Sequence, residues 1–204
     1  SLLRSRGRAV TPEDYEALVR EADSRVQRAR CVQPAAGGES SGPLAGQIYL
    51  LLVPKVNRPE SLIGEDQLRI DEDLRRSVAD YLDRFRLLTV RIDVREPEYF
   101  WIEVDLSLAA SAEADARRVQ LDAEQRLYRF LNPIVGGPAG DGWPFGRDLY
   151  PSDVFGCLQP VRGIEFIESL RLYRRRPSGE RAEITDRLEV PAHGLIGSGE
   201  HRVT

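Results

Sequence analysis

Methionine is absent from the sequence, even at position 1, so we expect the numbering to begin inside a longer protein. Cysteine is nearly absent: Cys31 and Cys157 are the only two, too few and too far apart to define a disulfide framework. Reduced, buried thiols are therefore expected, while a disulfide between the two stays open.

Long hydrophobic runs are also lacking. The longest apolar stretch, residues 48–54, is far shorter than the roughly 18 residues that a membrane-spanning helix needs, and it fits a buried strand.

The net charge of −4 lacks the basic surplus of a general nucleic-acid-binding domain, so no nucleic-acid partner is expected. Arginine supplies nearly all the positive charge, since Lys55 is the only lysine. Biased codon usage and a preference for bidentate interface ion pairs are both open explanations.

Phosphate-binding motifs are incomplete. Gly137 and Gly142 have the glycine spacing of a P-loop, but Trp143 and Pro144 follow where the motif needs lysine and serine or threonine. The loop also follows a predicted helix, whereas a P-loop follows a strand. The dinucleotide-binding fingerprint lacks its third glycine. We therefore expect no nucleotide cofactor.

Catalytic and metal-binding patterns are equally weak. His193 and His201 are the only histidines, and we expect both at the surface of a loop-rich tail. The acidic residues Asp66 and 71–73 fit a helix start better than a metal or acid–base site. A Gly-x-Ser-x-Gly sequence occurs at residues 38–42 (GESSG), but it falls in the expected flexible loop over 35–46 and not on the strand-to-helix turn that a nucleophile elbow needs. The sequence therefore predicts a protein that is not an enzyme and holds no cofactor and no metal.

A helix start is clearly encoded near the beginning of the chain. Thr11 can cap the helix, Pro12 fits its first position, and Asp14 favours the positive end of the helix dipole. Tyr15 begins an apolar face with helical spacing. We expect this helix to end near Ser24.

Apolar periodicity predicts the remaining elements. We expect helices over residues 71–85 and 112–131, and a short one capped by Ser152 through residue 158. Strands are expected over residues 26–32, 47–53, 88–94, 100–108, 164–173 and 181–190, with a loop over 35–46 and a turn over 174–179. The order is α-β-β-α-β over residues 1–96 and β-α-α-β-β over 97–204. This predicts an α+β fold of two small lobes, each a short antiparallel or mixed sheet packed with helices.

The loop over residues 132–147 stands out because it combines five glycines with large apolar side chains. Trp143 and Phe145 would be costly to expose, and Arg147 closes the segment. These three residues either fold back onto the core as loop anchors or contact a partner subunit, where tryptophan and arginine are common hot spots.

Two segments resemble a known family. Residues 8–16 (RAVTPEDYE) with the strand after them, and residues 135–137 (VGG) followed by 142–147 (GWPFGR), are similar to baseplate J-like wedge proteins of contractile phage tails and phage-tail-like contractile injection systems. The resemblance covers about residues 8–175. It places the matching region towards the C-terminal part of a longer protein.

The resemblance implies a non-enzymatic structural component of a baseplate wedge. Such a chain would assemble in the cytoplasm as a hetero-oligomer in a ring of sixfold symmetry around the hub, within a virion tail or a phage-tail-like particle. Implied partners are other wedge subunits and the small baseplate protein with a lysozyme-like fold, with the hub or spike and the first sheath ring as further candidates. The role would include coupling target contact to sheath contraction.

The alternative is a non-enzymatic assembly or adaptor module unrelated to contractile particles. Under the leading interpretation, charge reversal at Arg147 is expected to impair particle assembly without unfolding the chain.

Overall fold

The computed structural model describes Ala9, residues 11–33 and residues 46–204. The chain divides into two compact units, one formed by Ser1–Val56 with Gly64–Pro97, the other by Asn57–Ile63 with Glu98–Thr204. Arg8 and Val10 of the first motif lie outside the described residues, as does the expected loop over 35–46 except for Gly46.

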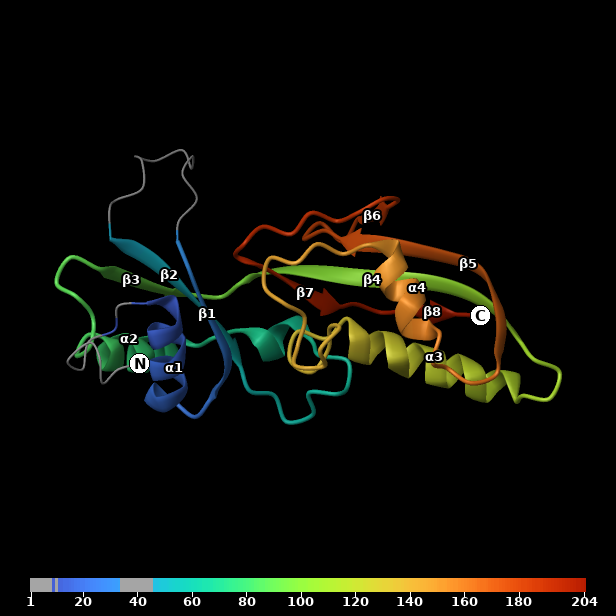
Figure 1. Cartoon of the computed structure of the whole chain (residues 1–204), viewed down its shortest axis with the longest axis horizontal. Coiled ribbons are helices and arrows are strands. Elements are labelled where there is room, and N and C mark those ends of the chain that lie inside the picture. Colours follow the sequence, from blue (N-terminus) through green and yellow to red (C-terminus); the bar gives the residue numbers. More distant parts are fainter. Residues whose placement is uncertain (1–8, 10, 34–45) are drawn as a thin grey trace. The chain divides into compact units, whose positions relative to one another are not determined.

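The first unit begins with helix α1 (Pro12–Ala22), as the sequence predicts. Strands β1 (Val26–Val32) and β2 (Gln47–Pro54) pair in antiparallel fashion, and β2 pairs in parallel with β3 (Arg91–Arg95). The result is a mixed three-stranded sheet with β2 in the centre (Figure 1). Because β2 is central, its residues from Leu50 to Val53 are all buried, which explains the continuous apolar run.

Helix α2 (Glu72–Leu82) completes the first unit. Its N-cap is Asp71, whose Oδ1 accepts a hydrogen bond from the amide of Leu74 at 2.7 Å. The 3₁₀ helix η1 (Glu65–Leu68) precedes it. The apolar core of the unit joins one face of the sheet to both helices, with the buried side chains of Tyr15, Leu18, Val19, Leu50, Leu52, Leu74, Val78 and Leu82.

The second unit is built around strand β4 (Glu98–Ala110), the longest in the chain. Its alternation is as predicted, with Phe100, Ile102, Val104, Leu106 and Leu108 buried. Strand β5 (Ile164–Arg175) pairs antiparallel with β4, and β6 (Arg181–Ile184) pairs antiparallel with β5. On its other side, β4 pairs in parallel with β7 (Gly194–Ser198) and β8 (Arg202–Val203).

Helices α3 (Ala116–Phe130) and α4 (Pro151–Leu158) pack with this sheet. The inward stripe of α3 is formed by Val119, Ala123 and Leu127, followed by the buried Leu131. Helix α3 begins later than residue 112, because Asp115 is the N-cap and its Oδ1 accepts hydrogen bonds from the amides of Arg117 and Arg118.

Other predicted boundaries are also wrong in detail: helix α2 ends at Leu82, before the predicted residue 85. Helix α4 is capped at Tyr150, with Pro151 in its first turn, so Ser152 lies inside the helix. Leu88 is 90% exposed because β3 starts only at Arg91. The last predicted strand stops at Ile184, after which Leu188 forms a single bridge to Leu149.

The C-terminal segment was predicted least well. Residues 194–203 supply β7 and β8, which the sequence did not indicate, and the predicted turn at residue 174 lies inside β5. The fold class is nevertheless confirmed: the structure is α+β, with four α-helices and two mixed sheets of three and five strands in the described chain.

Candidate functional site

The loop over residues 132–147 is organised by Asn132, a residue that sequence analysis did not single out. Its side-chain Oδ1 accepts hydrogen bonds from the amides of Ile134 (2.8 Å) and Val135 (3.0 Å). Its backbone carbonyl accepts from the amides of Gly136 (3.2 Å) and Trp143 (3.1 Å). One buried asparagine therefore holds both ends of the glycine-rich segment.

Trp143 is completely buried. Its indole Nε1 donates a hydrogen bond to the carbonyl of Arg147 at 3.1 Å, and its ring meets Phe130 edge to face at 5.5 Å. The sequence left open whether Trp143 folds back onto the core or contacts a partner subunit. In the structure its side chain folds back onto the core. Phe145 and Arg147 are only partly buried, so a partner contact by these two stays a prediction.

Arg147 links the loop to helix α4. Its Nη2 lies 2.9 Å from Oδ1 of Asp153, and its guanidinium lies 5.0 Å from the Trp143 ring centroid. The second Asp153 oxygen accepts the amide of Tyr150, so one carboxylate both caps α4 and neutralises Arg147. The Nη1 atom of Arg147 is buried without a hydrogen bond. Charge reversal at Arg147 is therefore expected to weaken the contact between the loop and α4, and its effect on assembly stays a prediction.

The first motif is an internal capping arrangement. The amide of Asp14 donates to Oγ1 of Thr11 (3.2 Å), and the amide of Thr11 donates to Oδ2 of Asp14 (3.0 Å). Pro12 occupies the first turn, where its missing N–H is not needed. The buried Tyr15 donates its hydroxyl to the carbonyl of Ala9 at 3.3 Å, and burial raises its pKa. The described part of this motif therefore shapes the start of α1.

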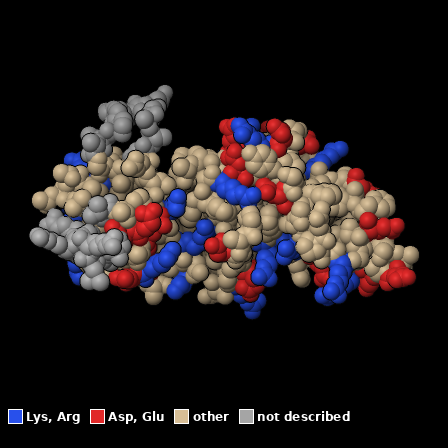
Figure 2. Space-filling view, in the orientation of Figure 1, with Lys and Arg blue, Asp and Glu red and all other residues tan. Residues whose placement is uncertain are grey.

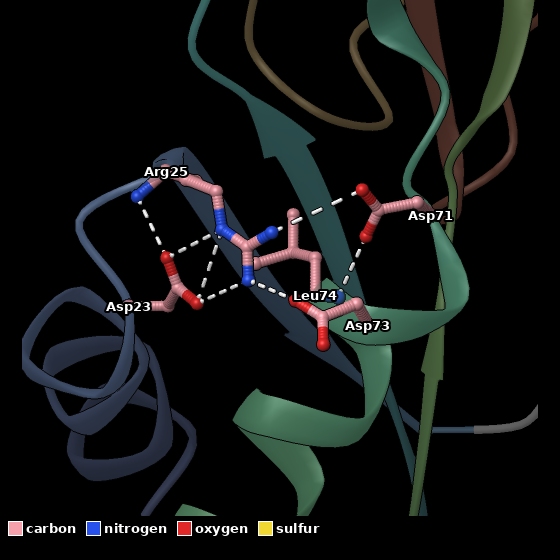
Figure 3. Close-up of polar contacts among 5 residues, drawn as sticks. All are labelled: Asp23, Arg25, Asp71, Asp73 and Leu74. Carbon is pink, nitrogen blue, oxygen red and sulfur yellow. Dashed lines mark hydrogen bonds and ion pairs between the residues drawn. The ribbon is translucent and has the colours of Figure 1, made fainter.

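A cluster around Arg25 joins the end of α1 to the start of α2. The Arg25 guanidinium contacts Asp23 at 2.8 Å, Asp73 at 2.9 Å and Asp71 at 3.9 Å (Figure 3). The hydrogen bonds from the Arg25 side chain lower the pKa of Asp23 to about 2. The acids at residues 71–73 thus cap the helix start and pair with an arginine of the same unit, in agreement with their interpretation as helix-start residues.

The sheet of the second unit carries a second charge network. Arg181 contacts Glu103 and Asp105, each at 2.8 Å, and lies over the Tyr173 ring at 3.9 Å. The contact to Glu103 is an ion pair without hydrogen-bond geometry at Nε. Figure 2 shows acidic and basic side chains intermixed where β6 lies.

Ser198 and His201 form a buried pair that deserves a chemical test, because serine and histidine are nucleophile and base in many hydrolases. Their Oγ and Nε2 atoms are 2.8 Å apart. The amide of Val104 donates to Nδ1 of His201, so the ring proton sits on Nε2, which donates to Ser198. A ring with this tautomer cannot take the serine proton. Burial also lowers the pKa of His201 to about 3.

This position corrects the prediction that both histidines are at the surface. His193 is indeed exposed, with Nε2 3.3 Å from Glu98, whereas His201 is 7% exposed and packs beside Tyr128. Within residues 46–204 and the described N-terminal stretch, no three acidic, histidine or cysteine side chains are grouped to hold a metal ion. Both thiols, Cys31 and Cys157, are free and buried. Among the described residues, no helix has the length and apolarity to cross a membrane.

No family model matches the chain, and no curated protein matches it. The chain is similar to one in the solved structure described as "Cryo-EM structure of the anti-feeding prophage (AFP) baseplate, 6-fold symmetrised". The two share 15% sequence identity with a TM-score of 0.62, over 98% of this chain and 39% of the other. At this identity the likeness shows a shared fold, and this chain spans well under half the length of its counterpart.

Proposed function

We propose that this chain is a structural part of the baseplate of a contractile injection particle. The observation that carries the proposal is the extent of the fold likeness: 98% of the chain, both units included, follows a chain of the anti-feeding prophage baseplate structure. Both units, which differ in sheet topology, lie within the matched part of the chain. A shared small motif on an unrelated scaffold would not extend this far.

The finer assignment is to a baseplate J-like wedge subunit. It is supported by what the two resembling segments do: one caps α1, and the other forms the loop held by Asn132 and Trp143. Both shape the backbone and neither presents a reactive group. Partners under this assignment are other wedge subunits and the small baseplate protein with a lysozyme-like fold, in a sixfold ring around the hub. Hub, spike and first sheath ring are further candidates.

A non-enzymatic role fits the chemistry of the described residues. The Ser198–His201 pair has the wrong tautomer for nucleophile activation, and the acids at the start of α2 are engaged with Arg25. The proposed work is mechanical: rigid units with polar surfaces can hold a ring and rearrange when the sheath contracts.

The test is a tagged pull-down of the full-length parent from its native host, followed by negative-stain electron microscopy. The expected result is sheathed tubes with the tag at one end, in a copy number that is a multiple of six. The untagged host serves as the control for adventitious tubes. A parent recovered alone, with no tube or sheath, would contradict the proposal and favour the adaptor alternative.

A further inference from the structure

A pocket opens between the C-terminal half of α3 and the glycine-rich part of the loop over residues 132–147. It is lined by Arg126, Arg129 and Phe130 from the helix and by residues 135–140 from the loop. None of these lining residues is acidic. The pocket therefore combines two cations with a wall of backbone.

The two arginines stand on one face of α3, because residues three apart in a helix are neighbours. Neither forms an ion pair with any described residue. Arg126 uses Nε to donate to the carbonyl of Cys157 at 3.0 Å, which fixes the direction of its side chain. Its two terminal nitrogens form no hydrogen bond within the described chain. This differs from Arg25, Arg147 and Arg181, whose guanidinium groups each have carboxylate partners within their own unit.

The loop wall is preformed. The amide of Gly137 donates to the carbonyl of Phe130 at 2.7 Å, and that of Gly142 donates to the carbonyl of Gly136 at 2.9 Å. A Cβ at Gly136 would lie 2.5 Å from the Phe130 carbonyl oxygen, so the loop is pressed onto the end of α3. Ala139, at the exposed part of the wall, has an amide without a partner in the described chain. A ligand would therefore meet a backbone wall that is already folded, which lowers the entropy cost of binding.

We infer that this pocket receives a carboxylate side chain from an acidic segment of a partner baseplate subunit. Guanidinium groups and a backbone amide suit a carboxylate, which can accept two parallel hydrogen bonds from one arginine. Both arginines are exposed to solvent, so a free anion would be held weakly and screened by salt. A carboxylate carried on a docked protein surface does not lose its full translational freedom at this site, because the rest of the interface already positions it. The inference rests on the proposed function for the identity of the partner.

The main test compares two double variants of the full-length parent, co-expressed with the other particle genes of its host. Arg126→Gln with Arg129→Gln removes both pocket charges. Arg117→Gln with Arg162→Gln removes two exposed arginines of the same unit that also lack ion pairs within the described chain and lie outside the pocket. We expect the incorporation of the pocket variant into particles to fall about tenfold, which is the effect of losing one or two charge-assisted hydrogen bonds. The incorporation of the control variant should stay within about twofold of that of the unmodified parent.

Equal incorporation of both double variants would overturn the inference while leaving the proposed function intact. Failure of the unmodified parent to enter any particle would instead count against the proposed function. Tryptophan-fluorescence unfolding of each variant checks that a loss of incorporation is not a loss of folding.

A second measurement identifies the occupant. A photo-crosslinking amino acid at Ala139, in assembled particles, should yield adducts with a segment of another subunit that contains aspartate or glutamate. Adducts confined to segments without acidic residues would overturn the inference. So would tight binding of inorganic phosphate by the unassembled parent, seen as shifts of the Arg126 and Arg129 Nε–H signals, since this would make the pocket a free-anion site.

Discussion

Trp101 and Gly197 face each other as partners in the parallel ladder between β4 and β7. A Cβ at Gly197 would lie 2.7 Å from Cζ3 of Trp101 and 2.9 Å from Cε3, closer than carbon atoms approach. The Trp101 ring in turn stacks on Tyr99 at 5.6 Å. The large Trp101 ring thus fills the space beside β7 that Gly197, which has no side chain, leaves open.

Gly197→Ala is expected to lower the free energy of unfolding of the second unit by about 1–3 kcal/mol, the usual cost of overpacking a filled site. Urea unfolding followed by tryptophan fluorescence measures this, because Trp101 and Trp143 are the only tryptophans and both lie in that unit. The matched control is Gly156→Ala in α4, where an added Cβ meets no atom within 4 Å. It should raise stability by up to about 1 kcal/mol through helix propensity. Unchanged stability of Gly197→Ala would show that β7 can shift away from Trp101.

Arg147→Glu is expected to destabilise the second unit by about 1–3 kcal/mol, because it places a second carboxylate beside Asp153 and removes a charged hydrogen bond. The same fluorescence-detected unfolding gives the value. Arg176→Glu is the control, since its pair with Glu180 is exposed and such pairs contribute at most about 1 kcal/mol. If both variants have the same free energy of unfolding, the partly buried Arg147–Asp153 pair stabilises the unit no more than the exposed pair does. Any assembly defect of Arg147→Glu can then be assigned to an interface.

The parts of the fold that were predictable from sequence are those specified by neighbouring residues. The cap at Thr11, the helical stripe of α2 and the alternation along β4 are local patterns with a direct physical cause. Strand β7 has no such pattern, because Gly194 and Gly197 lack strand propensity. Its extended form rests on pairing with β4, far earlier in the chain, where Gly197 lies opposite Trp101.

The candidate site divides in the same way. The composition of the loop over residues 132–147 pointed to Trp143 and Arg147, but their partners Asn132 and Asp153 are fixed by tertiary hydrogen bonds. One signal was available: an asparagine directly after a helix and before a proline is typical of a side chain that bonds its own following backbone. Arg126 had no comparable signal, since an exposed helical arginine becomes distinctive only beside the folded loop.

His201 makes the stability of the second unit depend on pH. Its folded-state pKa, about 3, lies below the ordinary 6.5, so between these values the unfolded chain binds more protons than the folded one. The stabilisation from neutral His201 is complete above pH 6.5 and declines as pH falls, by up to about 1.4 kcal/mol per unit. Unfolding measured at pH 7, 6 and 5 should show a smaller slope in His201→Gln than in the unmodified chain. His193→Gln is the matched control, and equal slopes for His201→Gln and the unmodified chain would contradict the prediction.

The Arg25 cluster gives the last prediction, a change of pKa at one carboxyl group. Hydrogen bonds from the Arg25 side chain are the main cause that holds the pKa of Asp23 at about 2, so Arg25→Gln should raise it towards 3.8. A carbon-detected NMR titration of the Asp23 carboxyl group measures this directly. A lowered carboxyl pKa stabilises the folded state above the unfolded value and loses this effect as pH falls towards the folded value. The free energy of unfolding of the first unit should therefore fall less between pH 4 and pH 2 in the variant than in the unmodified chain.

Arg76→Gln is the control, because the ion pair of Arg76 among the described residues is with Glu72, at 3.8 Å on the surface of the same helix. If the pKa of Asp23 stays near 2 in Arg25→Gln, its causes are the donors that survive the substitution: the backbone amide of residue 25, which donates to Oδ1 at 2.9 Å, and the Ser77 side chain. The side-chain bridge between the end of α1 and the start of α2 would then contribute little, and the packing of Leu18 and Val78 in the shared core would be what holds the two helices together.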